Sequence, residues 1–165
     1  MNKKINHGFV WAVLAFITLA FSPLAQAQKG DADKTVLSVT GKDQKQTLSM
    51  AALKALPQQT IVTKTPWYPD SVKFTGPLLR DVLALAKVKG ADISAIALND
   101  YKIHIPMSDA QQYDMILAHR INDEAIPVKT KGPLFVVYPF DSHPELQAKR
   151  YYERSIWQLK ALTVK

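Results

Sequence analysis

Phe74-Thr75-Gly76-Pro77-Leu78-Leu79-Arg80-Asp81-Val82-Leu83 is the stretch of sequence that decides the fold. The apolar residues in and after it recur at the spacing of one helix face: Leu78, Leu79, Val82, Leu83 and Ala86. This spacing predicts a helix that packs one face on a hydrophobic core. Gly76 is the expected N-cap, Pro77 the expected first helical residue, and Gly90 the expected end.

Strands are predicted on both sides of this helix. The segments with strand-like patterns are residues 35–40, 59–65, 95–98, 101–105, 115–120, 133–138 and 155–164. Residues 133–138 are continuously apolar, which predicts a strand buried on both faces. In the last segment, Trp157, Leu159 and Ala161 are expected on one side of the strand.

The rest of the chain is predicted to hold short helices and loops. Residues 47–56 have a helical pattern, with Ser49 as a suitable N-cap. Residues 66–71 are a predicted loop that carries two aromatic residues between two prolines, and residues 140–152 are predicted to be irregular. The fold class that follows is α+β, mostly β with a few short helices.

The N-terminus predicts export. Lys3 and Lys4 precede an apolar run at residues 8–21, which is followed by an Ala-x-Ala pattern ending at Ala27. This is the pattern of a secretory signal peptide covering residues 1–27. The alternative, a membrane anchor, needs about 20 apolar residues. We therefore expect a periplasmic protein with a single domain at residues 28–165.

Charge and cysteine usage exclude several classes of protein. The chain has a formal charge of +7, which falls to +5 without Lys3 and Lys4. Export argues against a nucleic-acid partner, so the charge indicates solubility or an anionic partner. The chain contains no cysteine, which excludes disulfides, thiolate metal ligands and a cysteine nucleophile.

Few residues suit a metal site or a hydrolytic triad. The histidines after the signal peptide, His104, His119 and His143, form no HExxH pattern. Asp141, His143 and Glu145 alternate and could bind a metal, but a solvated loop explains the same residues. No G-x-S-x-G sequence is present. We predict no metal and no catalytic residue.

The aromatic residues indicate a binding site. Trp67 lies in a predicted loop rather than on an apolar period, Tyr101 follows Asp100, and Trp157 follows Arg154. A flat heteroaromatic ligand needs a ring to stack on, a cation and polar groups for its edge. For Trp157, a place in the core explains the pattern equally well.

The order of four segments resembles the molybdopterin-binding domain of the sulfite oxidase fold. These segments are Phe74-x-Gly76-x-Leu78-Leu79-x-Asp81-Val82-Leu83, Asn99-Asp100-Tyr101-x-x-x-Ile105-Pro106, the run from Ile116-Leu117-Ala118 to Lys131-Gly132-Pro133-Leu134, and Arg154-Ser155-Ile156-Trp157. The resemblance implies that fold from about Val36 to the C-terminus.

The chain departs from the enzymes of that family at two places. In those enzymes a cysteine thiolate holds molybdenum, and by segment order its place falls near Thr63 to Thr65. A threonine hydroxyl is a poor substitute for a soft ligand. A lysine that follows the Arg-Ser pair in those enzymes is replaced here by Trp157.

The chain is therefore most similar to the cysteine-free, exported branch of the fold, which includes periplasmic pterin-binding proteins. The resemblance implies a free pterin as ligand and an inner-membrane signalling protein of cyclic-di-GMP turnover as partner. The implied ligand-binding residues are Thr65, Trp67, Asp100, Tyr101, Arg154, Ser155 and Trp157.

In that site, Trp67 and Trp157 would stack on the pterin, Arg154 would meet its carbonyl oxygen, and Asp100 would accept hydrogen bonds from its edge. Asp100 could instead only shape the turn before Tyr101. Two other functions stay open: a molybdopterin-dependent oxidoreductase with a non-thiolate metal site, and a ligand-free module that binds an acidic partner.

Overall fold

The computed structural model describes residues 34–165, so the predicted signal peptide lies outside the described residues. The strands are β1 (Thr35–Thr40), β2 (Lys45–Ser49), β3 (Gln58–Thr65), β4 (Tyr68–Pro77), β5 (Asp92–Ala97), β6 (Lys102–Pro106), β7 (Ile116–Ala118), β8 (Arg120–Ile121), β9 (Glu124–Ala125), β10 (Phe135–Val137) and β11 (Leu159–Val164). The helices are α1 (Met50–Ala55), α2 (Leu79–Leu85), α3 (Met107–Gln112), the 3-10 helix η1 (Pro144–Leu146) and α4 (Lys149–Arg154). The predicted α+β class, mostly β, is confirmed. Among the described residues, no helix is long and apolar enough to cross a membrane.

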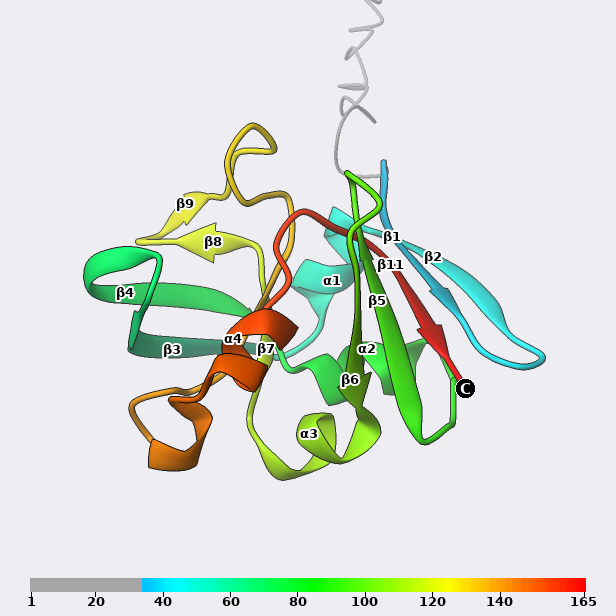
Figure 1. The fold of residues 1–165 in the computed structure, drawn as a ribbon. Helices are drawn as coiled ribbons and strands as arrows, with labels where there is room; N and C mark the ends of the chain where they lie inside the picture. The colour runs from blue at the N-terminus through cyan, green and yellow to red at the C-terminus, as the bar shows by residue number, and fades with distance from the viewer. Residues whose placement is uncertain (1–33) are drawn as a thin grey trace, which may run out of the picture.

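The strands form two larger sheets and one two-stranded ribbon. The five-stranded sheet has the order β2-β1-β11-β5-β6, in which only β1 and β11 are parallel neighbours. The four-stranded sheet has the order β3-β4-β8-β9 and is antiparallel throughout. Figure 1 shows these two sheets on opposite sides of the molecule, with β7 of the β7–β10 ribbon between them.

The β7–β10 ribbon separates two hydrophobic cores. Leu117 of β7 and Val136 of β10 belong to the larger core, under the five-stranded sheet. Ile116 of β7 and Phe135 of β10 belong to the smaller core, against the four-stranded sheet. Since neighbouring side chains on a strand point to opposite faces, each short strand supplies both cores. The prediction that residues 133–138 are buried on both faces is therefore confirmed.

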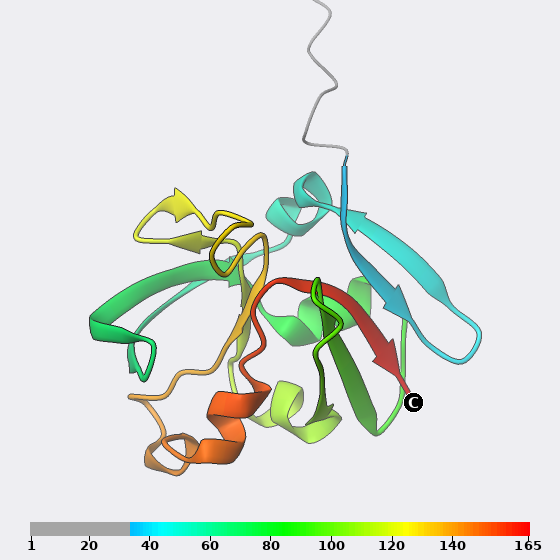
Figure 2. The same cartoon turned by 45° about the horizontal axis from the view of Figure 1, so that its top comes forward.

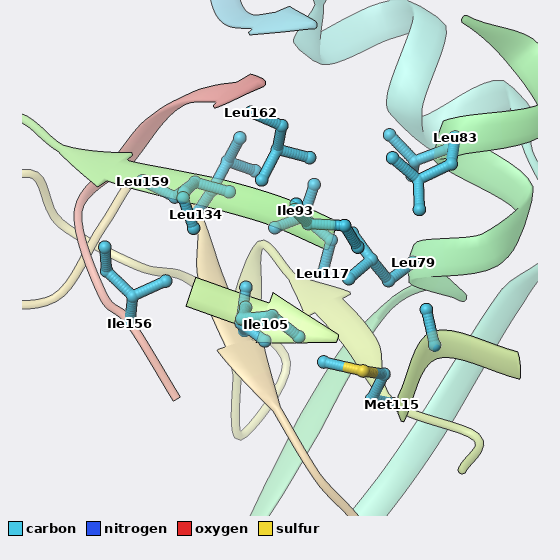
Figure 3. Close-up of a cluster of buried hydrophobic side chains, with 14 of the residues drawn as sticks. Leu79, Leu83, Ile93, Ile105, Met115, Leu117, Leu134, Ile156, Leu159 and Leu162 are labelled. Carbon is cyan, nitrogen blue, oxygen red and sulfur yellow. The ribbon is translucent and has the colours of Figure 1, made fainter. Parts of the chain in front are cut away.

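The stretch that decides the fold crosses from one core to the other. Phe74 is fully buried in the smaller core, whereas Leu79 and Leu83 of α2 are buried in the larger one. Figure 3 shows Leu79 and Leu83 beside the leucine and isoleucine side chains of the five-stranded sheet. The predicted helix and the buried face made by Leu79, Val82 and Leu83 are thus confirmed, but the helix ends at Leu85 and does not reach Gly90.

The predicted start of that helix is wrong. Gly76 and Pro77 continue β4 and pair with β3, and Leu78 occupies the N-cap position without a side-chain hydrogen bond. Gly76 is needed for another reason. A Cβ at Gly76 would lie 2.1 Å from the carbonyl oxygen of Leu117, because β4 passes directly against β7. The glycine permits close contact of two backbones rather than a helix cap.

Three other predictions need correction. Residues 47 and 48 lie in β2, so the first helix begins only at Met50, although Ser49 does cap it and accepts from the N–H of Ala52 at 3.2 Å. The predicted loop at residues 66–71 is a turn at Pro66 and Trp67 followed by β4. Residues 140–152 are not irregular, since they contain η1 and most of α4.

The prediction for the last strand is wrong in its start and its buried face. β11 begins at Leu159, so Trp157 lies before it, and the buried residues are Leu159, Leu162 and Val164. The pairing of β11 with β5 shifts register between Leu159 and Ala161. An irregularity of this kind moves the following side chains to the opposite face, which simple alternation does not anticipate.

We expect Gly76→Ala to destabilise the protein by at least about 2 kcal/mol, because the new methyl group would overlap the Leu117 backbone. Gly41→Ala is the matched control: its nearest neighbour is a methyl group of Val88 at 3.0 Å, which can move. Urea unfolding of both variants measures the difference. Equal stability of the two variants would contradict the proposed role of Gly76.

Candidate functional site

A pocket of about 410 Å³ opens where four parts of the chain meet. Its lining residues come from the β3–β4 turn, the β5–β6 hairpin, α4 and the segment after α4: Trp67, Ala97, Asn99, Tyr101, Lys149, Tyr152, Glu153, Ser155, Ile156 and Trp157. Figure 2 shows the chain leaving α4 and passing the tip of the β5–β6 hairpin before it enters β11. We call this cavity the aromatic pocket, because four of its lining residues are Trp67, Tyr101, Tyr152 and Trp157.

The aromatic rings of the pocket meet edge to face. The ring centroids of Trp67 and Trp157 are 5.7 Å apart with an interplanar angle of 80°. Those of Trp67 and Tyr152 are 6.1 Å apart at 84°. Trp67 also contacts Phe135 and Phe140 of the protein interior. Because the two indoles are nearly perpendicular, a flat ligand can lie parallel to only one of them.

Arg154 is hydrogen-bonded away from the pocket. Its Nη1 donates to Oδ2 of Asp109 at 2.8 Å, and the hydroxyl of Tyr138 donates to the same oxygen at 2.7 Å. Asp109 is buried, and burial together with this hydrogen bond raises the pKa of Tyr138, so its hydroxyl stays a donor. Arg154 therefore joins α4 to α3 and is not among the residues that line the pocket, while its contact with a ligand carbonyl stays a prediction.

Asp100 also lies outside the pocket lining. Its Oδ1 accepts from Nζ of Lys160 at 2.7 Å, and this hydrogen bond lowers the pKa of the carboxyl. Asp100 has a φ of 65°, and the neighbouring Asn99 accepts from the N–H of Tyr101 at 3.1 Å. Of the two readings left open by the sequence, the geometry favours the turn-forming one.

Thr65 and Ser155 are both buried, but only Ser155 lines the pocket. The Ser155 hydroxyl donates to the carbonyl of Tyr151 at 3.0 Å, which leaves its lone pairs available. Among the described residues, Oγ1 of Thr65 has no hydrogen-bond partner. The hydroxyl of Thr63 accepts from the N–H of Asp141 at 3.1 Å and thus joins β3 to the segment after β10.

The candidate metal residues do not converge. The Asp141 carboxylate accepts from the backbone N–H of Lys64 at 2.9 Å, whereas Nδ1 of His143 lies 3.6 Å from Oε1 of Glu145. Within residues 34–165, no three His, Cys, Asp or Glu side chains are grouped closely enough to hold a metal ion.

The structure thus brings together four of the seven predicted site residues and separates the other three. Trp67, Tyr101, Ser155 and Trp157 line the pocket, whereas Thr65, Asp100 and Arg154 do not. Sequence reasoning missed Lys149 and Glu153, because it did not predict α4. The opposite charges of Lys149 and Glu153 at positions i and i+4 were an available helix signal.

A comparison with protein families and a comparison with solved structures each found proteins that are similar to this chain. The family model described as "Oxidoreductase molybdopterin binding domain" matches residues 24–141. The chain is similar in structure to the sulfane dehydrogenase SoxCD from Paracoccus pantotrophus, with a TM-score of 0.62 and 17% identity. That match covers 82% of this chain but 39% of the other, so this chain spans well under half of its length. No match was found among curated proteins.

The donor atoms of this chain do not fit a molybdenum centre held by a thiolate. The whole sequence lacks cysteine. Near the position that the resemblance assigns to the metal ligand, the Thr63 hydroxyl is already bonded to the backbone and the Thr65 hydroxyl is buried outside the pocket lining. Neutral hydroxyls of this kind are weak ligands for a soft site.

We expect Asp109→Asn to destabilise the protein by on the order of 3 kcal/mol, because it leaves the Arg154 guanidinium without its carboxylate in a largely buried place. Asp114→Asn is the matched control, since it breaks an exposed pair with Arg80 of similar length, 2.7 Å, and should cost less than about 1 kcal/mol. Urea unfolding checks both values. A similar loss in the two variants would refute the role of Asp109 in holding α4.

Proposed function

The chain belongs to the family of oxidoreductase molybdopterin-binding domains, and we propose that it acts as an exported binding protein for a free pterin. In this proposal the protein resides in the periplasm after removal of residues 1–27. It relays the presence of the ligand to a membrane-bound signalling partner of cyclic-di-GMP turnover. The observation that carries the proposal is the aromatic pocket. The chain has no cysteine thiolate to bind molybdenum, although it belongs to a molybdopterin-binding family.

The size and chemistry of the pocket suit a small heteroaromatic ligand. Its volume of about 410 Å³ lies near the lower end of the range for small-molecule sites, about 300–1,000 Å³. Tyr101 is 47% exposed at the hairpin tip and lines the pocket, so its ring is accessible to a ligand. A pterin that stacks in the pocket would cover this ring and remove its apolar surface from water.

We assign the polar edge of the pterin to Glu153 in place of Asp100. Glu153 lines the pocket, and its nearest cation is the exposed ammonium of Lys149 at 3.7 Å. A carboxylate can accept two hydrogen bonds from the 2-amino group and the adjacent ring N–H of a pterin. Ser155 offers a further acceptor on the same wall.

The alternative is a molybdopterin-dependent oxidoreductase, which rests on family membership alone. The lack of a thiolate donor in the sequence argues against it. Metal analysis of protein purified from a molybdenum-replete host tests this alternative, because stoichiometric molybdenum would favour it over pterin binding.

Titration of the processed protein with neopterin tests the proposal. The chain has three tryptophans, and after removal of residues 1–27 only Trp67 and Trp157 remain, both at the pocket. Tryptophan emission should therefore change on binding. Tyr101→Ala should weaken binding by roughly fivefold through loss of ring contact. Leu98→Ala is the control, because Leu98 is exposed on the same hairpin without lining the pocket. No change in emission and no heat in calorimetry would rule the proposal out.

Glu153→Gln should weaken neopterin binding by roughly tenfold, because the amide loses the charge and one of the two acceptor oxygens that meet the pterin edge. Glu145→Gln is the matched control and should change affinity little, because Glu145 is an exposed carboxylate near His143 that does not line the pocket. Isothermal titration calorimetry on both variants gives the affinities. Unchanged affinity in Glu153→Gln would remove Glu153 from the site.

A further inference from the structure

The indole of Trp157 lines the aromatic pocket and also contacts the ammonium group of Lys131. Nζ of Lys131 is 4.2 Å from the centroid of the Trp157 ring and 5.9 Å from that of Tyr68. Trp157 lines the aromatic pocket, whereas Lys131 lines a second cavity of about 430 Å³. One face of the indole is therefore already occupied by a cation.

The backbone around Lys131 is fixed by close packing. The carbonyl of Lys131 accepts from the N–H of Gln158 at 3.0 Å, and the N–H of Gly132 donates to the carbonyl of Pro127 at 2.9 Å. A Cβ at Gly132 would lie 1.9 Å from the carbonyl oxygen of Ile126, so this position needs a glycine. These contacts hold Lys131 next to Gln158, the residue that follows Trp157.

Without Lys131, the pocket would suit an organic cation. Nearly perpendicular aromatic rings with a carboxylate beside them, here Glu153, are the usual arrangement for binding an ammonium group. A cation held against Trp157 reduces the negative potential of the ring and repels a second cation bound at the same ring. A neutral ring does not meet this repulsion.

We propose that Lys131 is a specificity-determining residue of the aromatic pocket, which acts through Trp157 to favour a neutral heteroaromatic ring over an organic cation. This inference rests on the proposed function, because the neutral ring is the free pterin. Lys131 does not touch the ligand, so its effect is on ligand selectivity.

The experiment measures affinities for neopterin and for choline by calorimetry on the processed protein and three variants. Lys131→Met keeps the length of the side chain and removes its charge, and it should lower the ratio of neopterin to choline affinity by roughly fivefold. Lys131→Arg keeps a cation on the ring and should retain the wild-type ratio. Lys129→Met is the matched control: Lys129 is exposed on the same loop and makes no cation–π contact in residues 34–165.

The outcomes separate the inference from the proposed function. An unchanged ratio in Lys131→Met, with neopterin still bound, overturns the inference and leaves the proposed function standing. An equal change in Lys129→Met also overturns it, because loop charge alone would then explain the effect. If the wild-type protein binds neither probe, or binds choline more tightly than neopterin, both the proposed function and the inference fall. Thermal unfolding of each variant distinguishes a change in selectivity from a loss of fold.

Discussion

The burial of the β7–β10 ribbon on both faces is the constraint on which the rest of the structure depends. Two strands of three residues each supply apolar side chains to two separate cores, and all six of these residues are fully buried. The four-stranded sheet can reach the ribbon only because β4 crosses β7 at Gly76. The larger sheet reaches it through α2 and the leucines of β11. Each core therefore depends on the correct placement of the same short ribbon.

The aromatic pocket is assembled at the edge of this arrangement from segments far apart in the chain. Trp67 is placed by the turn between β3 and β4, and Tyr101 by the hairpin of the other sheet. The wall between them is α4, a helix of six residues that has little stability of its own. The buried Asp109 compensates by binding Arg154 and Tyr138 together. Asp109, Arg154 and Tyr138 thus hold α4 in place, and the side chains that line the pocket remain available to contact a ligand.

Much of the fold could be predicted from sequence, because it depends on local patterns. The apolar run at residues 133–138 and the helical spacing after Leu78 both report burial directly. Gly76 was misassigned because a glycine that caps a helix and one that admits a neighbouring backbone look alike in one sequence. The helix α4 was missed because its exposed face is strongly charged, and Tyr151 is its one buried residue.

The site could be predicted only in part, because some of its side chains are positioned by partners far away in the sequence. Trp67 is predictable because an aromatic ring outside an apolar period suggests a surface role, whereas Tyr101 and Trp157 are indicated by the charged residues near them and by the family resemblance. All three line the pocket. The roles of Arg154 and Asp100 depended on partners that the sequence cannot show. Asp109 lies 45 residues from Arg154, and Lys160 lies 60 residues from Asp100. Side chains of this kind can be assigned only after the chain has been folded.

The position of β11 has a consequence for how the chain reaches its native state. The last strand in the sequence is the middle strand of the five-stranded sheet, between β1 and β5. Until residues 159–164 have left the ribosome, β1 and β5 have no common neighbour and the larger core stays open. The five-stranded sheet therefore cannot close until β11 is available to pair with both neighbours. The larger core therefore depends on pairings between segments far apart in the sequence, which form more slowly than the local hairpins of the same sheet.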